Sequence, residues 1–170
     1  MAMWRGNTPL ILASRSAARQ ALLAGAGIEF EAVPANIDER AVQQSAALAA
    51  PGEIAAFLAR EKALSVSRFE IDRYVLGADQ TLAVGETLLT KPPGRTEATT
   101  QLCALSGRVH DLHSAVAVAY DGKILFEHVA VARMTMRPLS RAEIATYLDE
   151  AGERVLTFPL VQRGARTHRP

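Results

Sequence analysis

The residues best suited to chemistry are charged and polar side chains placed where apolar segments end. Asp79 and Gln80 interrupt the stretch VLGADQTLAVG, and Glu39 lies in a polar cluster after another short apolar segment. Lys62 and Lys91 add separate positive charges. Carboxylates from different loops together with several cations suit a polyphosphate and its metal, because Mg²⁺ prefers oxygen ligands and the remaining phosphate charge requires Lys or Arg. These residues therefore predict phosphate chemistry.

Ser14 and Arg19 lie where the apolar run 10–13 gives way to a helical pattern. The unpaired N–H groups and positive dipole end of such a helix attract an anion, and Arg19 lies one turn inside. We therefore expect Ser14 and Arg19 to bind phosphate. Serines at this position can instead act only as helix caps, and the pattern alone slightly favours that plainer alternative. Asp79 can likewise act only as the cap of a turn after the buried strand.

Several familiar site motifs are missing from the sequence. It contains no GxxxxGKS or GxxxxGKT loop, and no GxGxxG follows a predicted strand. His110 and His113 fall on a predicted strand, where a spacing of three places them on opposite faces, so they are not expected to share a metal. The residue types of a hydrolytic triad are present in Ser106, Ser114, His110 and Asp111, but the GxSxG turn that such enzymes use is missing.

The composition is that of an ordinary globular chain. It has 19 Lys and Arg against 18 Asp and Glu, so the protein has no large net positive charge that would attract nucleic acid. The single cysteine, Cys103, excludes an internal disulfide and suits a reducing compartment. The N-terminal segment lacks a signal-peptide pattern, and no stretch approaches the ~18 apolar residues that span a bilayer. We expect a cytoplasmic protein that contacts neither nucleic acid nor membrane.

The hydrophobic pattern predicts an α/β fold. Short apolar segments around residues 10–13, 30–34 and 74–78 read as strands, the last ending at Asp79, and Asp121-Gly122 joins two longer strands as a hairpin. Helices are expected after Ser14, from Pro51, from a Thr96 cap to residue 105, and after Ser140. Ser140 and Glu143 have the spacing of a capping box at the start of that last helix. In the Pro51 helix, Lys62 continues an apolar stripe.

Taken in order, several segments resemble the Maf family of nucleoside triphosphate pyrophosphatases. They are LILASRSAARQALL, FEAVPANIDER, the helix containing AREKA, VLGADQTLAVGETLLTKP, LSGRVHDLHSAVAV and MRPLSRAEIATYL. Together they cover about residues 9–153. We therefore expect residues 1–153 to form a single Maf-like domain, followed by an atypical arginine-rich tail, 154–170.

The resemblance implies a fold and an activity. The fold is a twisted mixed sheet flanked by helices, with two lobes around a central cleft, and members of the family are often homodimers. The activity is hydrolysis of the α–β phosphoanhydride of a nucleoside triphosphate to a monophosphate and pyrophosphate, with Mg²⁺ or Mn²⁺. Asp79 is then the base, Glu39 and Asp79 bind metal, and Glu39, Lys62 and Lys91 assist catalysis. Ser14, Arg19 and Gln80 bind substrate.

The sequence departs from the family pattern at two places. Ala17-Ala18-Arg19 replaces the family's Pro-Arg-Arg, which predicts weaker phosphate binding. The segment after Glu153 lacks the family's closing motifs and resembles the product of a shifted reading frame. The alternative function is therefore a nucleotide-binding module with impaired catalysis. Gln80 after Asp79 resembles the branch that acts on methylated GTP or pyrimidine triphosphates.

Overall fold

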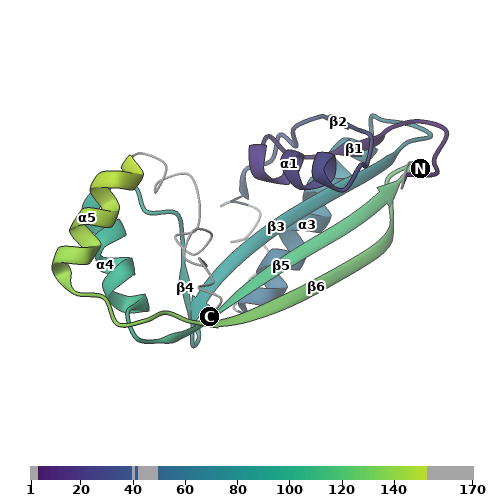
Figure 1. Ribbon diagram of the computed structural model, residues 1–170. Coiled ribbons are helices and arrows are strands. Elements are labelled where there is room, and N and C mark those ends of the chain that lie inside the picture. Colours follow the sequence, from purple (N-terminus) through teal and green to yellow (C-terminus); the bar gives the residue numbers. More distant parts are fainter. Residues whose placement is uncertain (1–3, 40, 42–49, 153–170) are drawn as a thin grey trace, which may run out of the picture. The chain divides into compact units, whose positions relative to one another are not determined.

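The computed structural model describes residues 4–39, 41 and 50–152 (Figure 1). The predicted tail, 154–170, lies outside these residues. In chain order the elements are β1 (Leu10–Leu12), α1 (Ala17–Gly25), β2 (Phe30–Ala32), α3 (Pro51–Ser67), β3 (Tyr74–Val84), β4 (Thr87–Leu89), α4 (Arg95–Leu105), β5 (Val109–Tyr120), β6 (Lys123–Thr135) and α5 (Arg141–Ala151).

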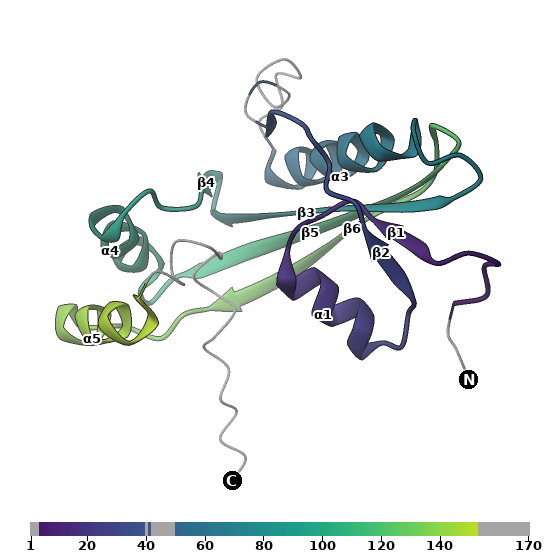
Figure 2. The ribbon, with the colours of Figure 1, turned by 90° about the horizontal axis from the view of Figure 1, so that it is seen from above.

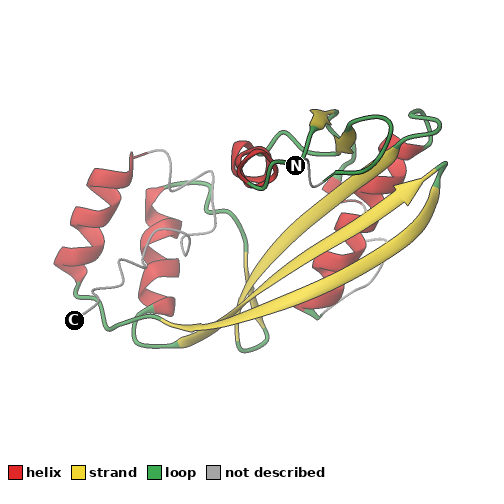
Figure 3. Ribbon diagram, turned by 45° about the vertical axis from the view of Figure 1, so that its right-hand side comes forward, coloured by secondary structure: helices red, strands yellow, loops and turns green. Residues whose placement is uncertain are grey.

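The strands form one mixed sheet in the order β2-β1-β3-β5-β6, with β4 paired to β3 (Figure 3). Strand β1 runs parallel to both β2 and β3, and β4 runs antiparallel to β3. Strands β5 and β6 are joined by Asp121 and Gly122, which both have the positive φ that such a short turn requires. The predicted α/β class and the Asp-Gly hairpin are confirmed.

The chain divides into two compact units. The first comprises Met1–Thr81 and His113–Val131, and the second Leu82–Leu112 and Ala132–Pro170. In the first unit, α3 and α1 lie on opposite sides of the strands (Figure 2). The main core of this unit consists of small residues from α3 and β5: Ala55, Ala59, Ala63, Ala115, Ala117 and Ala119.

Small residues allow α3 to approach the sheet very closely. A Cβ atom built on Gly77 of β3 would lie against the carbonyl oxygen of Ala59 and 2.6 Å from the backbone nitrogen of Ala63. That space is too small for any side chain. A glycine inside a strand often marks such a close approach of another backbone. Gly77 therefore determines how near α3 and its side chains come to β3.

The second unit buries apolar residues between α4 and α5. Its core contains Ala98 and Leu102 from α4, and Ile144 and Leu148 from α5. A capping box begins α5: Ser140 accepts from the Glu143 backbone at 3.2 Å, and Glu143 accepts from the Ser140 backbone at 2.8 Å. The capping box predicted from the spacing of Ser140 and Glu143 is confirmed.

Two details of the expected elements are wrong. Strand β3 does not end at Asp79 but continues through it to Val84, because Lys62 satisfies the carboxylate inside the fold and no turn is needed. Helix α4 begins at Arg95 with Gly94 as its N-cap, so Thr96 is not the cap. The Thr96 side chain thus lies inside the first turn instead of preceding it.

The capping box predicts a loss of stability in acid. Hydrogen bonds from the Ser140 backbone, and next from the Arg137 side chain, lower the pKa of Glu143 from its ordinary 4.5 to about 2. Because this pKa is lower in the folded state, the stabilisation is complete above about pH 5 and is lost as pH falls toward about 2. Urea unfolding of E143Q should show lower stability than wild type at pH 7 and a shrinking difference between pH 5 and 2. The matched variant E150Q, at the other end of α5, should show no such convergence.

Among the residues that the structure describes, every helix is too short or too polar to cross a lipid bilayer.

Candidate active site

Three predicted site residues meet in the first unit. Lys62 Nζ donates to Asp79 Oδ1 at 2.6 Å and forms an ion pair with Glu39 Oε1 at 2.9 Å. The Lys62 and Asp79 side chains are only 9% and 11% exposed, whereas Glu39 is 56% exposed. A buried lysine thus links a buried carboxylate to one at the surface.

The local sequence explains this meeting. Ile54, Leu58 and Lys62 occupy successive turns of one α3 face, and all three are buried, as the spacing predicted. On β3, side chains alternate between faces, so Gly77 and Asp79 point toward the same side. Because Gly77 admits the α3 backbone, Lys62, which lies one residue before Ala63, reaches Asp79 directly.

Burial controls the charge of Asp79. Desolvation raises the pKa of its carboxyl above the ordinary value, and the charge and hydrogen bond of Lys62 partly oppose that rise. The nearby charge of Glu39 raises the pKa further, whereas Arg19 lowers it. Asp79 is therefore a stronger base than an exposed aspartate, and four charged residues influence one another at this point.

Ser14 and Arg19 form a small polar group at the start of α1. Arg19 Nη1 donates to Ser14 Oγ at 3.2 Å, and Ser14 itself is buried. Ser16, the N-cap, accepts from the Arg19 backbone at 3.4 Å. The capping role considered for the serines thus belongs to Ser16, while Ser14 accepts from the Arg19 guanidinium, whose charge acts to lower the pKa of Asp79.

Gln80 follows Asp79 on β3 and contacts a different residue. Its Nε2 donates to Ser114 Oγ on β5 at 2.7 Å. Since adjacent strand residues point to opposite faces, Gln80 is directed away from the Lys62 side of the sheet. The structure therefore does not bring Gln80 into the ion-paired group.

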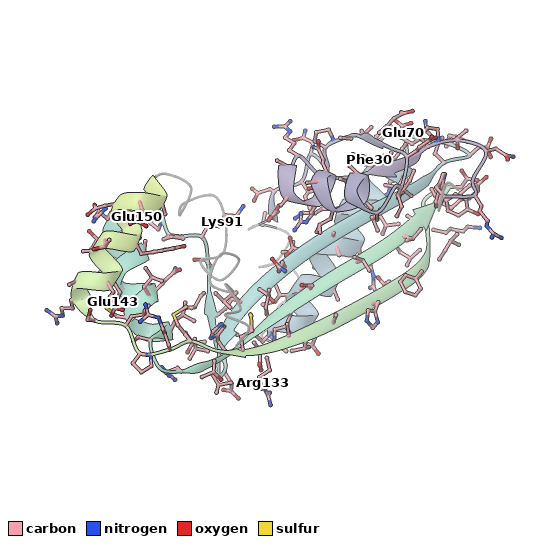
Figure 4. The ribbon with its side chains drawn as sticks, in the orientation of Figure 1. Phe30, Glu70, Lys91, Arg133, Glu143 and Glu150 are labelled. Atoms are coloured by element: carbon pink, nitrogen blue, oxygen red, sulfur yellow. The ribbon has the colours of Figure 1, made fainter. Side chains whose placement is uncertain are left out.

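Lys91 belongs to the second unit. It follows β4, is exposed, and is labelled in Figure 4. Pro92 and Pro93 come directly after it, and the backbone there is neither helix nor strand, as two prolines predict. Lys91 is thus not among the residues that the first unit brings together.

The two carboxylates could contribute to a metal site but do not complete one. Asp79 and Glu39 both bind the same ammonium nitrogen, so their oxygens are close enough to share a cation. Within the described ranges, no group of three or more His, Cys, Asp or Glu residues could hold a metal ion. Mg²⁺ usually keeps several waters and takes substrate phosphates as ligands, so two carboxylates are a sufficient number of protein ligands for it.

Sequence reasoning missed two residues that shape this region. Gly77 determines the approach of α3, and a glycine inside an apolar strand pattern was the available signal. Ser114 holds Gln80, but no sequence signal gives that pairing, since it depends on the register of β3 against β5. His110 and His113 both lie on β5, as predicted.

Comparison with known proteins gives matches over most of the chain. The family profile described as Maf-like protein matches residues 9–164. A nucleoside triphosphate pyrophosphatase of Bradyrhizobium diazoefficiens is 57% identical over 157 residues, which are 92% of this chain and 78% of that protein. A 7-methyl-GTP pyrophosphatase of Rhizobium meliloti is 45% identical over 150 residues, covering 87% of this chain and 75% of that protein.

Solved structures give a more distant match. A HAM1 protein from Coxiella burnetii superposes with a TM-score of 0.48 and 18% sequence identity, covering 74% of this chain and 71% of that one.

Proposed function

Because this chain belongs to the Maf family, we propose that it is a nucleoside triphosphate pyrophosphatase. It cleaves the anhydride between the α and β phosphates of its substrate. Water supplies the oxygen that bonds to phosphorus, the bridging P–O bond breaks, and the products are a nucleoside monophosphate and pyrophosphate. Its substrates are nucleoside triphosphates, including modified ones.

The observation that carries this proposal is the buried contact of Lys62 with Asp79. Asp79 orients the attacking water and accepts its proton, and its raised pKa makes it better suited to that task. Lys62, which lies 2.6 Å from Asp79, stabilises negative charge that develops on the phosphates. Lys91 is proposed to assist on the departing pyrophosphate.

Glu39 and Asp79 are proposed to hold a divalent cation, Mg²⁺ or Mn²⁺. Both offer oxygen ligands and already share a cationic group, the Lys62 ammonium. Such a cation neutralises phosphate charge and makes water a stronger acid. Glu39 would contribute its carboxylate from the surface, since its side chain is 56% exposed, and Asp79 would contribute from the interior.

Substrate binding is assigned to Ser14, Arg19 and Gln80. Arg19 suits a phosphate because its planar guanidinium offers several hydrogen-bond donors. One of these, Nη1, donates to Ser14 Oγ, which orients the guanidinium. We propose methylated GTP and pyrimidine triphosphates as the first substrates to test. A cytoplasmic location is also proposed, in keeping with the single free thiol of Cys103. We propose further that the protein forms a homodimer.

Pyrophosphate release tests the proposed activity. The purified chain is incubated with 7-methyl-GTP, GTP, UTP and dTTP in the presence of Mg²⁺ or Mn²⁺, and the products are separated by chromatography. The proposal expects equal amounts of monophosphate and pyrophosphate. Release of inorganic phosphate with a diphosphate would indicate cleavage at another bond. Thermal stabilisation by nucleotide without turnover would favour a binding module instead.

Replacement of Arg19 should weaken substrate binding more than it slows the chemical step. A hydrogen bond to a charged group contributes about 1.5–3 kcal/mol, so R19A should raise KM for the triphosphate roughly 10- to 100-fold. Steady-state kinetics on the preferred substrate measures this change. The exposed Arg15 provides the matched control, and R15A should retain a KM near that of wild type. Equal KM values in the two variants would remove Arg19 from the proposed phosphate site.

A further inference from the structure

The Lys62 ammonium lies where the two carboxylates of the candidate site would hold a metal ion. Its Nζ is 2.6 Å from Asp79 Oδ1 and 2.9 Å from Glu39 Oε1. The Lys62 side chain is only 9% exposed, so solvent and salt screen its charge weakly. A divalent cation bound to the same two carboxylates would therefore lie next to a full positive charge in a buried site. Because like charges repel strongly there, the site cannot hold both cations well at the same time.

The charged residues around Asp79 favour a divalent cation only in the company of phosphate. Lys62 binds both carboxylates, and the positive charge of Arg19 also acts on Asp79. A divalent cation that arrives alone is repelled by Lys62 and by Arg19. A triphosphate reverses this effect, because its oxygens attract both side chains and can share the cation as ligands. Metal and nucleotide thus each improve the site for the other.

An exchange of partners at this site requires movement of the Lys62 side chain alone. The α3 backbone is held against β3 at Gly77, where it approaches the strand too closely for a Cβ atom. Thr81 Oγ1 on β3 also donates to the carbonyl of Pro51, in the first turn of α3, at 2.8 Å. The flexible four-carbon stem of lysine, in contrast, allows its ammonium to turn from a carboxylate to a phosphate.

We infer that Lys62 couples metal binding to nucleotide binding: its ammonium holds Asp79 and Glu39 until a nucleotide arrives, then turns to the phosphates and leaves both carboxylates to the metal. The free chain therefore binds a divalent cation weakly, and the nucleotide raises that affinity. By linkage, the metal raises the affinity for the nucleotide by the same factor. The inference rests on the proposed metal and phosphate sites, but it concerns binding and not the chemical step.

Binding of Mn²⁺ to the free chain provides the first test. Electron paramagnetic resonance measures free Mn²⁺ while the full chain is titrated without nucleotide. K62M removes the ammonium but keeps a side chain of similar length, so it should bind Mn²⁺ about tenfold more tightly than wild type, or better. K123M removes an exposed lysine from β6 and should bind Mn²⁺ as wild type does. The double variant K62M/D79N should lose the gain in affinity, which would locate the ion at Asp79.

A second variant provides for the case in which K62M does not fold. Removal of one partner from a buried ion pair is strongly destabilising, so circular dichroism is recorded for each variant. K62Q removes the charge but keeps a hydrogen-bond donor for Asp79, and it should gain affinity for Mn²⁺ as K62M does. Mn²⁺ affinities of the folded variants equal to that of wild type would overturn the inference.

The wild-type chain with a nucleotide analogue measures the coupling itself. The α,β-methylene analogue of GTP has carbon in place of the bridging oxygen and is not cleaved there. With this analogue, the affinity of the wild-type complex for Mn²⁺ should rise about tenfold or more, observed as faster relaxation of water protons. Wild type that binds Mn²⁺ as tightly without the analogue as with it would contradict the coupling. Turnover is measured separately, so a chain that hydrolyses triphosphates but shows no coupling disproves only this inference, and a coupled chain without turnover disproves only the proposed activity.

Discussion

D79N is expected to abolish pyrophosphate release while the protein remains folded. Removal of a general base costs on the order of 10²–10⁴-fold in rate, and an amide cannot accept the proton from water. Asparagine keeps the shape of the side chain and can still accept a hydrogen bond from Lys62, which lies 2.6 Å from Asp79 Oδ1. Single-turnover measurement of monophosphate formation checks the loss.

The free energy of unfolding of D79N should depend less on pH than that of wild type. Because burial raises the folded-state pKa of Asp79, ionisation of this carboxyl costs folding stability as pH rises through that pKa. At neutral pH the free energy of unfolding of D79N should therefore equal or exceed that of wild type. Any excess should shrink on acidification, as the Asp79 carboxyl of wild type becomes protonated. The control D149N makes the same chemical change at an exposed site and should retain turnover. Turnover of D79N near the wild-type rate would exclude Asp79 as the base.

G77A is expected to be the most damaging single methyl addition in the first unit. The added carbon would meet the Ala59 carbonyl and the Ala63 backbone nitrogen, and both of these residues are fully buried. Overpacking of a close-packed region costs typically about 1–3 kcal/mol and shifts the backbone. Since α3 also carries Lys62, its displacement should lengthen the contact with Asp79. We expect both a lower midpoint of chemical unfolding and a lower kcat.

The matched control for G77A is G25A. Gly25 ends α1, and a Cβ atom there would meet nothing within 4 Å. Replacement of a glycine in an unstrained helical position stabilises a protein by roughly 0.4–1 kcal/mol, largely through the unfolded state. Urea denaturation should thus move the two variants in opposite directions. Equal stability of G77A and wild type would show that α3 is not held against β3 as described.

Local pattern predicted much of the site. The apolar stripe through Ile54 and Leu58 placed Lys62 on the buried face of α3, and the structure bears this out. The Ser140–Glu143 spacing predicted a capping box, which is present. Both depend on contacts within one helix, so a single segment of sequence contains the whole signal.

Contacts between distant segments could not be predicted in the same way. The apolar pattern placed the end of a strand at Asp79, because a carboxylate normally cannot remain inside a sheet without a partner. Its partner is 17 residues away on α3, where the sequence shows only a lysine in an apolar stripe. The Gln80–Ser114 hydrogen bond spans 34 residues and depends on strand register. Such pairs appear only when the elements are packed.

The Lys62 ammonium also bears on the folding of the first unit. A carboxylate as buried as that of Asp79 would be costly to keep ionised without a counter-charge, and here the chain supplies one from its own helix. The fold thus contains an internal counter-ion. It follows that the charge of the buried Asp79 carboxylate is compensated when the first unit folds, with no group from outside the chain.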